Sequence, residues 1–259
     1  MNNELSKQDL NWCLRRIPAP VRDEIKTRKG IVVAGGLIRS CITGEKINDI
    51  DIFGPNKSDL EAMARKLAAH GGKSRRVIET TNAFTVPGWK PTLQFIHRWL
   101  YERPEEVVES FDFTICSAAI WYNGTRWCSS ISDTFYQDLA AKRLVYTCPQ
   151  RNEDAGGSML RVLKYYQRGY RMPLDSLGAV ISRLVMGVDI DKMMARGEFD
   201  ENSLSRILTG LLVEVDPILD PEHLVHMPSD AEEEEIREEM EGETDDQETP
   251  QEEITPSGA

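Results

Sequence analysis

Two acidic residues, Asp49 and Asp51, are separated by one apolar residue in a segment with the alternating pattern of a β-strand. Side chains two residues apart in a strand project from the same face, so we expect the two carboxylates to lie together, with Ile50 and Ile52 packed on the opposite face. Two adjacent carboxylates repel each other unless a counter-charge lies nearby. Mg²⁺ would supply that charge, because it binds a few carboxylates together with phosphate oxygens of a substrate. The spacing therefore predicts a magnesium site with Asp49 and Asp51 as metal ligands.

A double glycine, Gly35-Gly36, follows the short apolar run at 31–34, and twelve residues separate it from Asp49. A strand that ends in two glycines and runs into a helix lets backbone N–H groups approach phosphate oxygens closely. Arg39, three residues after Gly36, is expected to add a positive charge there. A phosphate cradle beside paired carboxylates is what phosphoryl transfer from a nucleoside triphosphate needs, since the protein supplies positioning and charge stabilisation. Two metal ions at such a site would activate an attacking hydroxyl and neutralise the leaving pyrophosphate.

These residues resemble a known superfamily. Val-Val-Ala-Gly-Gly-Leu-Ile-Arg at 32–39, followed by Asn-Asp-Ile-Asp-Ile at 48–52, is similar to the signature of DNA polymerase beta-like nucleotidyltransferases. Within that superfamily it is most similar to the head domain of tRNA CCA-adding enzymes and bacterial poly(A) polymerases, whose turn reads Gly-Gly-x-x-Arg. The resemblance implies an α+β fold, a small mixed sheet flanked by helices, with a short helical neck segment after it. It also implies transfer of a nucleoside monophosphate to a hydroxyl, with Mg²⁺ as cofactor.

Further segments extend the resemblance over roughly residues 28–172. Phe-Asp-Phe-Thr-Ile-Cys-Ser-Ala at 111–118 resembles a family segment that helps to select ribose, which implies a role for Asp112. Leu-Arg-Val-Leu-Lys at 160–164, after Glu153-Asp154, resembles the segment that opens the neck helix. That segment reads the base and contacts the triphosphate, so the resemblance implies nucleotide binding by Arg161 and Lys164.

The chain departs from the family pattern near the metal. The family places a third carboxylate on another strand, and the alignment puts Gln94 at that position, in a strand expected at 93–99. Asp112 could supply the third carboxylate instead, or contact the ribose, because we expect its strand to lie beside that of Asp49 and Asp51. Ser40 stands where the family usually has aspartate.

The elements that must position these residues follow from the pattern of apolar and turn residues. We expect N-terminal helices at 1–29, a nucleotidyltransferase head at 30–150, a helical neck-like segment at 151–228 and a disordered acidic tail at 229–259. The expected strands are 31–34, 47–53, 76–80, 83–86, 93–99 and 111–122. The expected helices are 5–16, a short one ending near 29, 37–43, 59–70 with Ser58 as its cap, 105–109, 137–142, 158–170, 174–196 and 202–214.

Composition narrows the class of protein. Hydrophobic residues make up 40% of the 259 residues, enough for a sizeable core, and the net charge is −12. Residues 229–259 hold 14 acidic residues and one arginine, so the remainder is nearly neutral. No apolar run approaches the ~20 residues that cross a bilayer, and the N-terminal residues lack the apolar centre of a signal peptide. The five cysteines form no Cys-x-x-Cys pair, so we expect a cytoplasmic protein with reduced thiols and no membrane partner.

The sequence leaves open which molecule accepts the nucleoside monophosphate. The resemblance favours a nucleoside triphosphate and an RNA 3′ end as partners, but about 55 residues between Tyr170 and the acidic tail leave no room for the helical regions that grip tRNA. The same chemistry on a protein or a small molecule is the first alternative. An inactive nucleotide-binding scaffold is the second.

Four basic residues recur at helical spacing: Arg161, Lys164, Arg168 and Arg171. Two interpretations of this pattern carry equal weight: a surface that contacts a triphosphate or RNA, and a basic helix face exposed to solvent.

Overall fold

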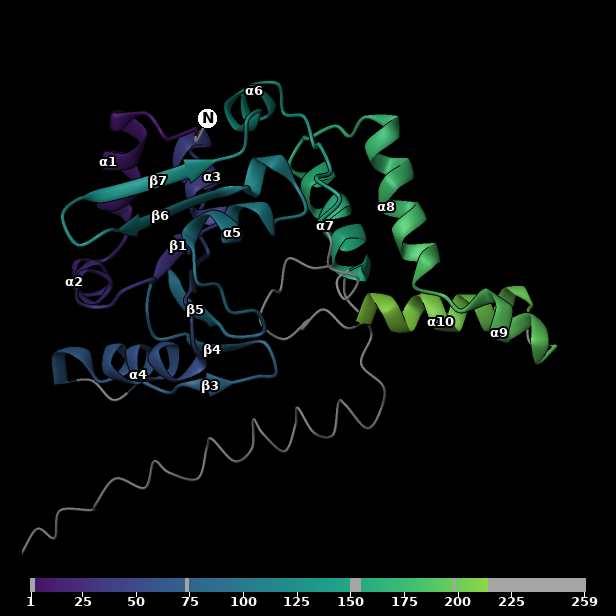
Figure 1. Cartoon of the computed structure of the whole chain (residues 1–259), viewed down its shortest axis with the longest axis horizontal. Coiled ribbons are helices and arrows are strands. Elements are labelled where there is room, and N and C mark those ends of the chain that lie inside the picture. Colours follow the sequence, from purple (N-terminus) through teal and green to yellow (C-terminus); the bar gives the residue numbers. More distant parts are fainter. Residues whose placement is uncertain (1–2, 73–74, 150–154, 198, 214–259) are drawn as a thin grey trace, which may run out of the picture. The chain divides into compact units, whose positions relative to one another are not determined.

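The computed structural model describes residues 3–72, 75–149, 155–197 and 199–213, and Met1–Val215 form one compact unit (Figure 1). The predicted acidic tail and Glu153-Asp154 lie outside the described residues. The strands are β1 (Val32–Ala34), β2 (Asp49–Phe53), β3 (Ile78–Glu79), β4 (Ala83–Val86), β5 (Thr92–Ile96), β6 (Ala118–Tyr122) and β7 (Trp127–Ile131). The helices are α1 (Lys7–Arg16), α2 (Ala19–Thr27), α3 (Gly36–Thr43), α4 (Lys57–Ala68), α5 (Pro104–Glu109), α6 (Phe135–Ala140), α7 (Ala155–Gln167), α8 (Leu174–Met186), α9 (Ile190–Ala195) and α10 (Glu201–Val213).

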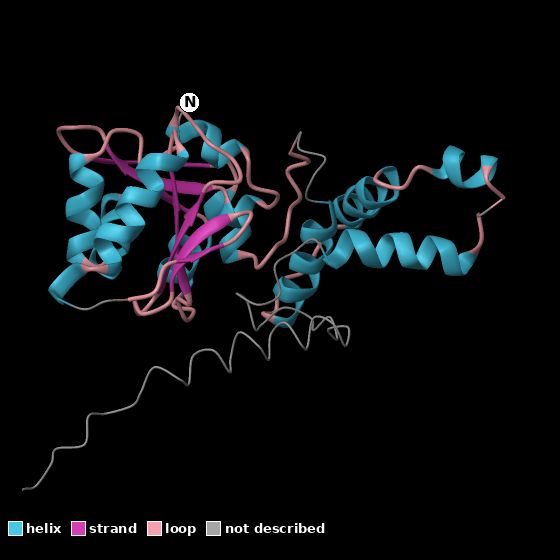
Figure 2. Cartoon of the chain, turned by 90° about the horizontal axis from the view of Figure 1, so that it is seen from below, coloured by secondary structure: helices cyan, strands magenta, loops and turns pink. Residues whose placement is uncertain are grey.

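The strands form one mixed sheet in the order β3-β4-β5-β2-β1-β6-β7. β2 and β5 run parallel, and the other neighbouring strands run antiparallel. Helices surround these strands, and α7, α8 and α10 form a group of their own (Figures 1 and 2). The fold is therefore the α+β arrangement that the sequence predicts. Among the described residues, no helix has both the length and the apolar character that crossing a bilayer requires.

The two faces of the sheet carry separate apolar clusters. Ile50 and Ile52 of β2 are fully buried in the larger cluster, which also takes in side chains from α1 to α4 and α7. Burying one such side chain contributes about 1.5–3 kcal/mol, so the alternation in β2 fixes which face its other residues occupy. The opposite face has the smaller cluster, which includes Ala34, Phe53 and Ala119. Asp49 and Asp51 alternate with the isoleucines and are half-buried, which places them on this second face.

The prediction of one strand over 111–122 was wrong. β6 begins only at Ala118, and residues 114–116 form a single turn of 3₁₀ helix. The hydroxyl of Thr114 donates to the buried carboxylate of Asp138, 2.6 Å away, and this contact holds the chain in the turn. β6 pairs with β1 and not with β2, so Asp112 does not lie on a strand beside Asp49 and Asp51.

β7 was not expected from its sequence, because Cys-Ser-Ser at its centre has little β-strand preference. A tight turn after β6 forms it: the Asn123 side chain accepts hydrogen bonds from the N–H groups of Thr125 and Arg126, and Gly124 has φ +94°. The Asn-Gly pair in this turn is a hairpin signal that the sequence did contain.

Three helices differ from expectation at their ends. Asn56 caps α4, since its side-chain oxygen accepts from the N–H of Asp59, so Ser58 is not the cap. The expected helix at 174–196 is two helices, α8 and α9, and Asp189 caps the second. α7 ends at Gln167, so Arg168 and Arg171 do not continue its face.

Candidate functional site

The paired carboxylates lie in the middle of the sheet. In β2, Asp51 is paired with Ala34 of β1 on one side and with Gln94 of β5 on the other. Asp49 is paired with Thr92. Paired residues in adjacent strands point to the same face, so the face that carries the two carboxylates also carries Gln94. The small side chain of Ala34 leaves space beside Asp51.

The glycine turn lies against the same carboxylate. Gly35 has φ +80° and ψ −135°, a conformation open to glycine, and its N–H donates to the carbonyl of Ala118. A Cβ atom at Gly35 would lie 3.6 Å from Asp51 Oδ2 and 3.1 Å from the ring of Phe111. α3 begins at Gly36, so the first N–H groups of this helix, which lack i−4 acceptors, start beside Asp51. The N–H of Ile38 donates to the carbonyl of Gly35. The structure thus brings Gly35, Gly36 and Asp51 together.

A side chain at Gly35 is expected to disrupt this junction. Gly35→Ala would force alanine into a backbone conformation that costs about 1–3 kcal/mol and would press its Cβ against Phe111. We expect both a lower free energy of unfolding in urea and a loss of nucleotide transfer. Gly44→Ala is the matched control, because Gly44 also has positive φ, +74°, but nothing lies within 4 Å of its Cβ position. Equal transfer by the two variants would contradict the assignment.

The oxygen donors on this face fit a hard divalent cation. Two carboxylates and the carboxamide oxygen of Gln94 are ligand types that Mg²⁺ accepts, with the remaining positions left to phosphate oxygens and water. Gln94 is paired with Asp51, and it is the residue that the family alignment puts at the position of the third carboxylate. Among the described residues, no three His, Cys, Asp or Glu side chains cluster in a way that could hold a metal ion.

Asp112 lies against α7. Its carboxylate is almost fully buried, and Oδ2 accepts from Arg161 Nη1 at 2.7 Å and from Ser158 Oγ at 3.0 Å. The structure therefore joins two of the predicted site residues, Asp112 and Arg161, in one ion pair. Lys164 lies one turn further along α7 and is half-buried. Sequence reasoning missed Ser158, and nothing in the sequence connects it with Asp112.

Arg39 lies inside the protein. Its side chain is 4% exposed, and Nη1 donates to the hydroxyl of Tyr165 on α7 at 2.7 Å. Nη2 donates to Ser40, and Nε forms an ion pair with Glu45 at 3.3 Å. Burial alone would lower the pKa of Arg39, but attraction to Tyr165, Cys116 and Glu45 raises it above its ordinary value, so the side chain stays charged. Its predicted contact with phosphate stays a prediction.

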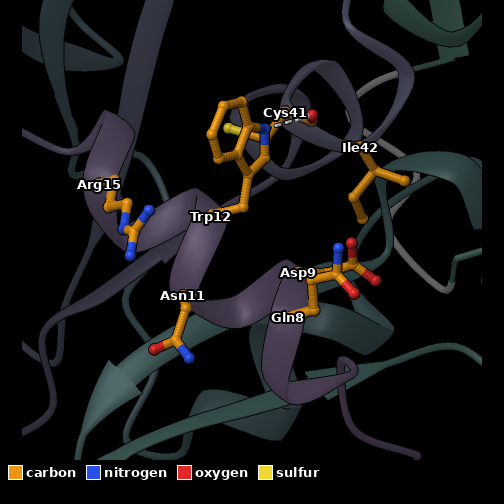
Figure 3. Close-up of a pocket in the computed structure, with 7 residues that line it drawn as sticks. All are labelled: Gln8, Asp9, Asn11, Trp12, Arg15, Cys41 and Ile42. Atoms are coloured by element: carbon orange, nitrogen blue, oxygen red, sulfur yellow. Dashed lines mark hydrogen bonds between the residues drawn. The ribbon is translucent and has the colours of Figure 1, made fainter.

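A hollow of about 570 Å³ lies between α1 and α3 and contains none of the predicted site residues (Figure 3). The side chain of Trp12 lines this hollow, and its Nε1 donates to the carbonyl of Cys41 at 3.0 Å. Asp9 at its edge accepts from the hydroxyls of Ser6 and Tyr136. The Trp12 contact fastens α1 onto α3, and the Tyr136 contact fastens α1 onto α6.

Comparison with known proteins gives a family and a fold. A family model described as "Gabija anti-defense 2 family protein" matches residues 4–142. The curated protein "Gabija anti-defense 2" of Bacillus phage SPbetaL7 is 25% identical over 147 residues, which are 57% of this chain and 35% of that protein. The chain thus covers about a third of that relative.

Solved structures with a similar fold are CCA-adding enzymes. The Thermotoga maritima CCA-adding enzyme complexed with tRNA has a TM-score of 0.51 and 17% identity, over 85% of this chain and 53% of that one. A CCA-adding enzyme in complex with ATP has a TM-score of 0.55 and 18% identity, over 84% of this chain and 52% of that one. The chain spans about half the length of these enzymes. The likeness confirms the nucleotidyltransferase fold.

Proposed function

The chain belongs to the Gabija anti-defense 2 family, and from this membership together with its fold we propose that it is a magnesium-dependent nucleotidyltransferase. It moves a nucleoside monophosphate from a nucleoside triphosphate to a hydroxyl and releases pyrophosphate. One observation carries the proposal: the carboxylate of Asp51, on the face shared with Asp49, lies within contact distance of the Gly35 turn. A metal ion held by the carboxylates would therefore lie next to a ready site for phosphate.

Each site residue has a role in this proposal. Asp49 and Asp51 hold Mg²⁺, which supplies charge neutralisation for the triphosphate and activation of the acceptor hydroxyl. The backbone N–H of Gly36, at the start of α3, binds phosphate oxygens. Gly35 contributes the turn that brings them close, since its own N–H donates to the carbonyl of Ala118. Arg161 and Lys164 face the triphosphate from α7. Their charges add to a site that is otherwise dominated by carboxylates.

Asp112 serves this site through α7. Its ion pair with Arg161 fixes that guanidinium at 2.7 Å, with 32% of the Arg161 side chain still exposed. A guanidinium has five N–H groups, so Arg161 can contact more than one partner while it keeps its ion pair with Asp112. Because Asp112 is bound in this way, we assign it to positioning and ribose contact in preference to metal binding.

We propose an RNA 3′ end as the acceptor. The support is the fold, shared with an enzyme solved in complex with tRNA. The family description favours a second candidate, because a protein that acts against a defence could modify a protein component of that defence. The two acceptors differ in the sensitivity of the labelled product to ribonuclease and protease.

The test offers the purified protein labelled ATP, CTP, GTP and UTP in turn, with Mg²⁺ and either total RNA or a protein extract. We expect one or two of the nucleotides to label RNA and release pyrophosphate, and EDTA to stop the reaction. Label in a protease-sensitive product would select the second acceptor. Release of no pyrophosphate with any nucleotide and either acceptor would instead identify an inactive nucleotide-binding scaffold and refute the proposed function.

A further inference from the structure

A buried polar cluster lies behind the glycine turn, where α3 meets α7. Its centre is Arg39, whose guanidinium contacts Tyr165, Ser40 and Glu45 and lies 3.8 Å from Cys116 Sγ. The guanidinium also lies 5.0 Å from the centroid of the Tyr165 ring. Burial of a charge is costly unless the charge is paired and hydrogen-bonded. Here Nη1 and Nη2 donate hydrogen bonds, and Nε pairs with Glu45 by charge without a hydrogen bond.

The same cluster connects the turn with α7. On one side, a Cβ atom at Gly36 would lie 3.8 Å from Arg39 Nη2, so the guanidinium lies directly beneath the turn. On the other side, Tyr165 is buried and belongs to α7. Arg161 lies four residues before Tyr165, and residues four apart share one face of a helix. Arg39 therefore lies between the glycine turn and Tyr165, on the face of α7 that also carries Arg161.

Glu45, the acidic partner of Arg39, also contacts residues that directly follow α7. Glu45 pairs with Arg39 at 3.3 Å and with Arg168 at 3.9 Å, and it accepts a hydrogen bond from the hydroxyl of Tyr170 at 3.4 Å. Glu45 follows α3 directly after its cap, Gly44. The position of α7 is thus set from both ends of α3.

The hydroxyl of Tyr165 is suited to this contact. Burial raises its pKa well above the ordinary value for tyrosine, so it stays a neutral phenol. Its oxygen accepts from Arg39 at 2.7 Å and lies 2.8 Å from Cys116 Sγ. Cys116 sits in the 3₁₀ turn that follows Asp112, so this hydroxyl also ties α7 to the segment that binds Arg161.

We propose that Arg39 is a positioning residue: through the hydroxyl of Tyr165 it holds α7 against the glycine turn, so that Arg161 faces the triphosphate. The inference rests on the proposed function and gives Arg39 a role inside the protein in place of direct phosphate contact. Removing the hydroxyl lets α7 shift relative to the turn and weakens nucleotide binding through Arg161. A phosphate ligand at position 39 would act independently of Arg161.

The test is a double-mutant cycle on nucleotide affinity, with the full chain and the non-hydrolysable analogue α,β-methylene-ATP in the presence of Mg²⁺. Tyr165→Phe is expected to weaken binding about tenfold, the size of one hydrogen bond to a charged group. Arg161→Ala weakens binding as well, and adding Tyr165→Phe to Arg161→Ala changes the affinity no further. Tyr166→Phe is the matched control, because Tyr166 is the next residue on α7 and its side chain is 58% exposed; it leaves the affinity unchanged.

Glu45→Gln provides a second variant in case Tyr165→Phe lowers the fraction of folded protein. It removes the counter-charge of Arg39 but keeps an oxygen at that position, and its effect on affinity is again expected to vanish in the Arg161→Ala background. Strictly additive effects in both cycles, or an unchanged affinity in Tyr165→Phe, would overturn the inference. That failure is distinct from failure of the proposed function, which concerns pyrophosphate release by the unmodified chain.

Discussion

Replacing Asp51 by asparagine is expected to abolish nucleotide transfer and leave the fold intact. The substitution keeps size and hydrogen-bonding capacity but removes one of the two charges that hold Mg²⁺. Loss of a partner in the outer shell of a metal site already costs about 10- to 100-fold, so loss of a direct ligand should exceed that range. The measurement is the initial rate of pyrophosphate release at saturating nucleotide, with far-UV circular dichroism and urea unfolding to check the fold.

The control for this experiment is an exposed aspartate of the N-terminal helices. Asp23→Asn on α2 changes the net charge in the same way, but the Asp23 side chain is 71% exposed and pairs only with the neighbouring Lys26 among the described residues. It should leave the rate unchanged. Asp49→Asn should match Asp51→Asn, since both lie on one face of β2. Full activity of either site variant would show that the carboxylate pair does not bind the catalytic metal.

The centre of the site could be predicted because it depends on short-range geometry. The i, i+2 spacing of Asp49 and Asp51 places both on one face of any strand, and burial of Ile50 and Ile52 decides which face that is. Gly35-Gly36 marks a turn by its chemistry alone. The family signature then supplied the pairing of the two segments, which spacing by itself could not give.

The rest of the site depends on contacts between residues far apart in the chain. Asp112 and Arg161 are 49 residues apart, and Arg39 and Tyr165 are 126 apart. From sequence, an arginine after a glycine turn indicates phosphate binding. The sequence does not show that Tyr165 and Glu45 contact its side chain inside the protein. The same limit explains the misplaced strand at 111–122, where the hydrogen bond from Thr114 to Asp138 outweighs strand preference.

The carboxylates and the glycine turn lie together because of the order of the strands. β2 in the middle of the sheet provides the carboxylates, and β1 beside it leads into the turn. Positive charge has to come from outside the sheet, and in the proposed function Arg161 and Lys164 of α7 provide it. The site thus depends on packing between the head and the first helix of the neck-like segment, so contacts that fix this packing should affect nucleotide binding as well as stability.

The largest effect on stability is expected from Asp138→Ala. Asp138 is fully buried, and its carboxylate accepts hydrogen bonds from Thr114 and Thr134, both at 2.6 Å, and pairs with Arg143 at 2.6 Å. Removing one member of a buried ion pair costs about 3–5 kcal/mol. We expect about 3 kcal/mol, the lower end of that range, because Arg143 is 47% exposed and can be hydrated when its partner is lost.

Urea unfolding of Asp138→Ala and of Asp133→Asn would test this expectation. Asp133 is exposed and accepts one hydrogen bond, from Asn3, so its substitution should change the free energy of unfolding by less than about 0.5 kcal/mol. Asp138→Asn should fall between the two: both threonines donate to Oδ2, so one amide oxygen can still accept from them, but the ion pair with Arg143 is lost. A change below about 1 kcal/mol in Asp138→Ala, the size of an average substitution, would mean that the two threonines and Arg143 find other partners. In that case the 3₁₀ turn keeps Cys116 beside Tyr165 without the carboxylate, and nucleotide binding should survive the substitution. If the free energy of unfolding instead falls by about 3 kcal/mol, nucleotide binding should weaken as well, because Thr114 begins that turn.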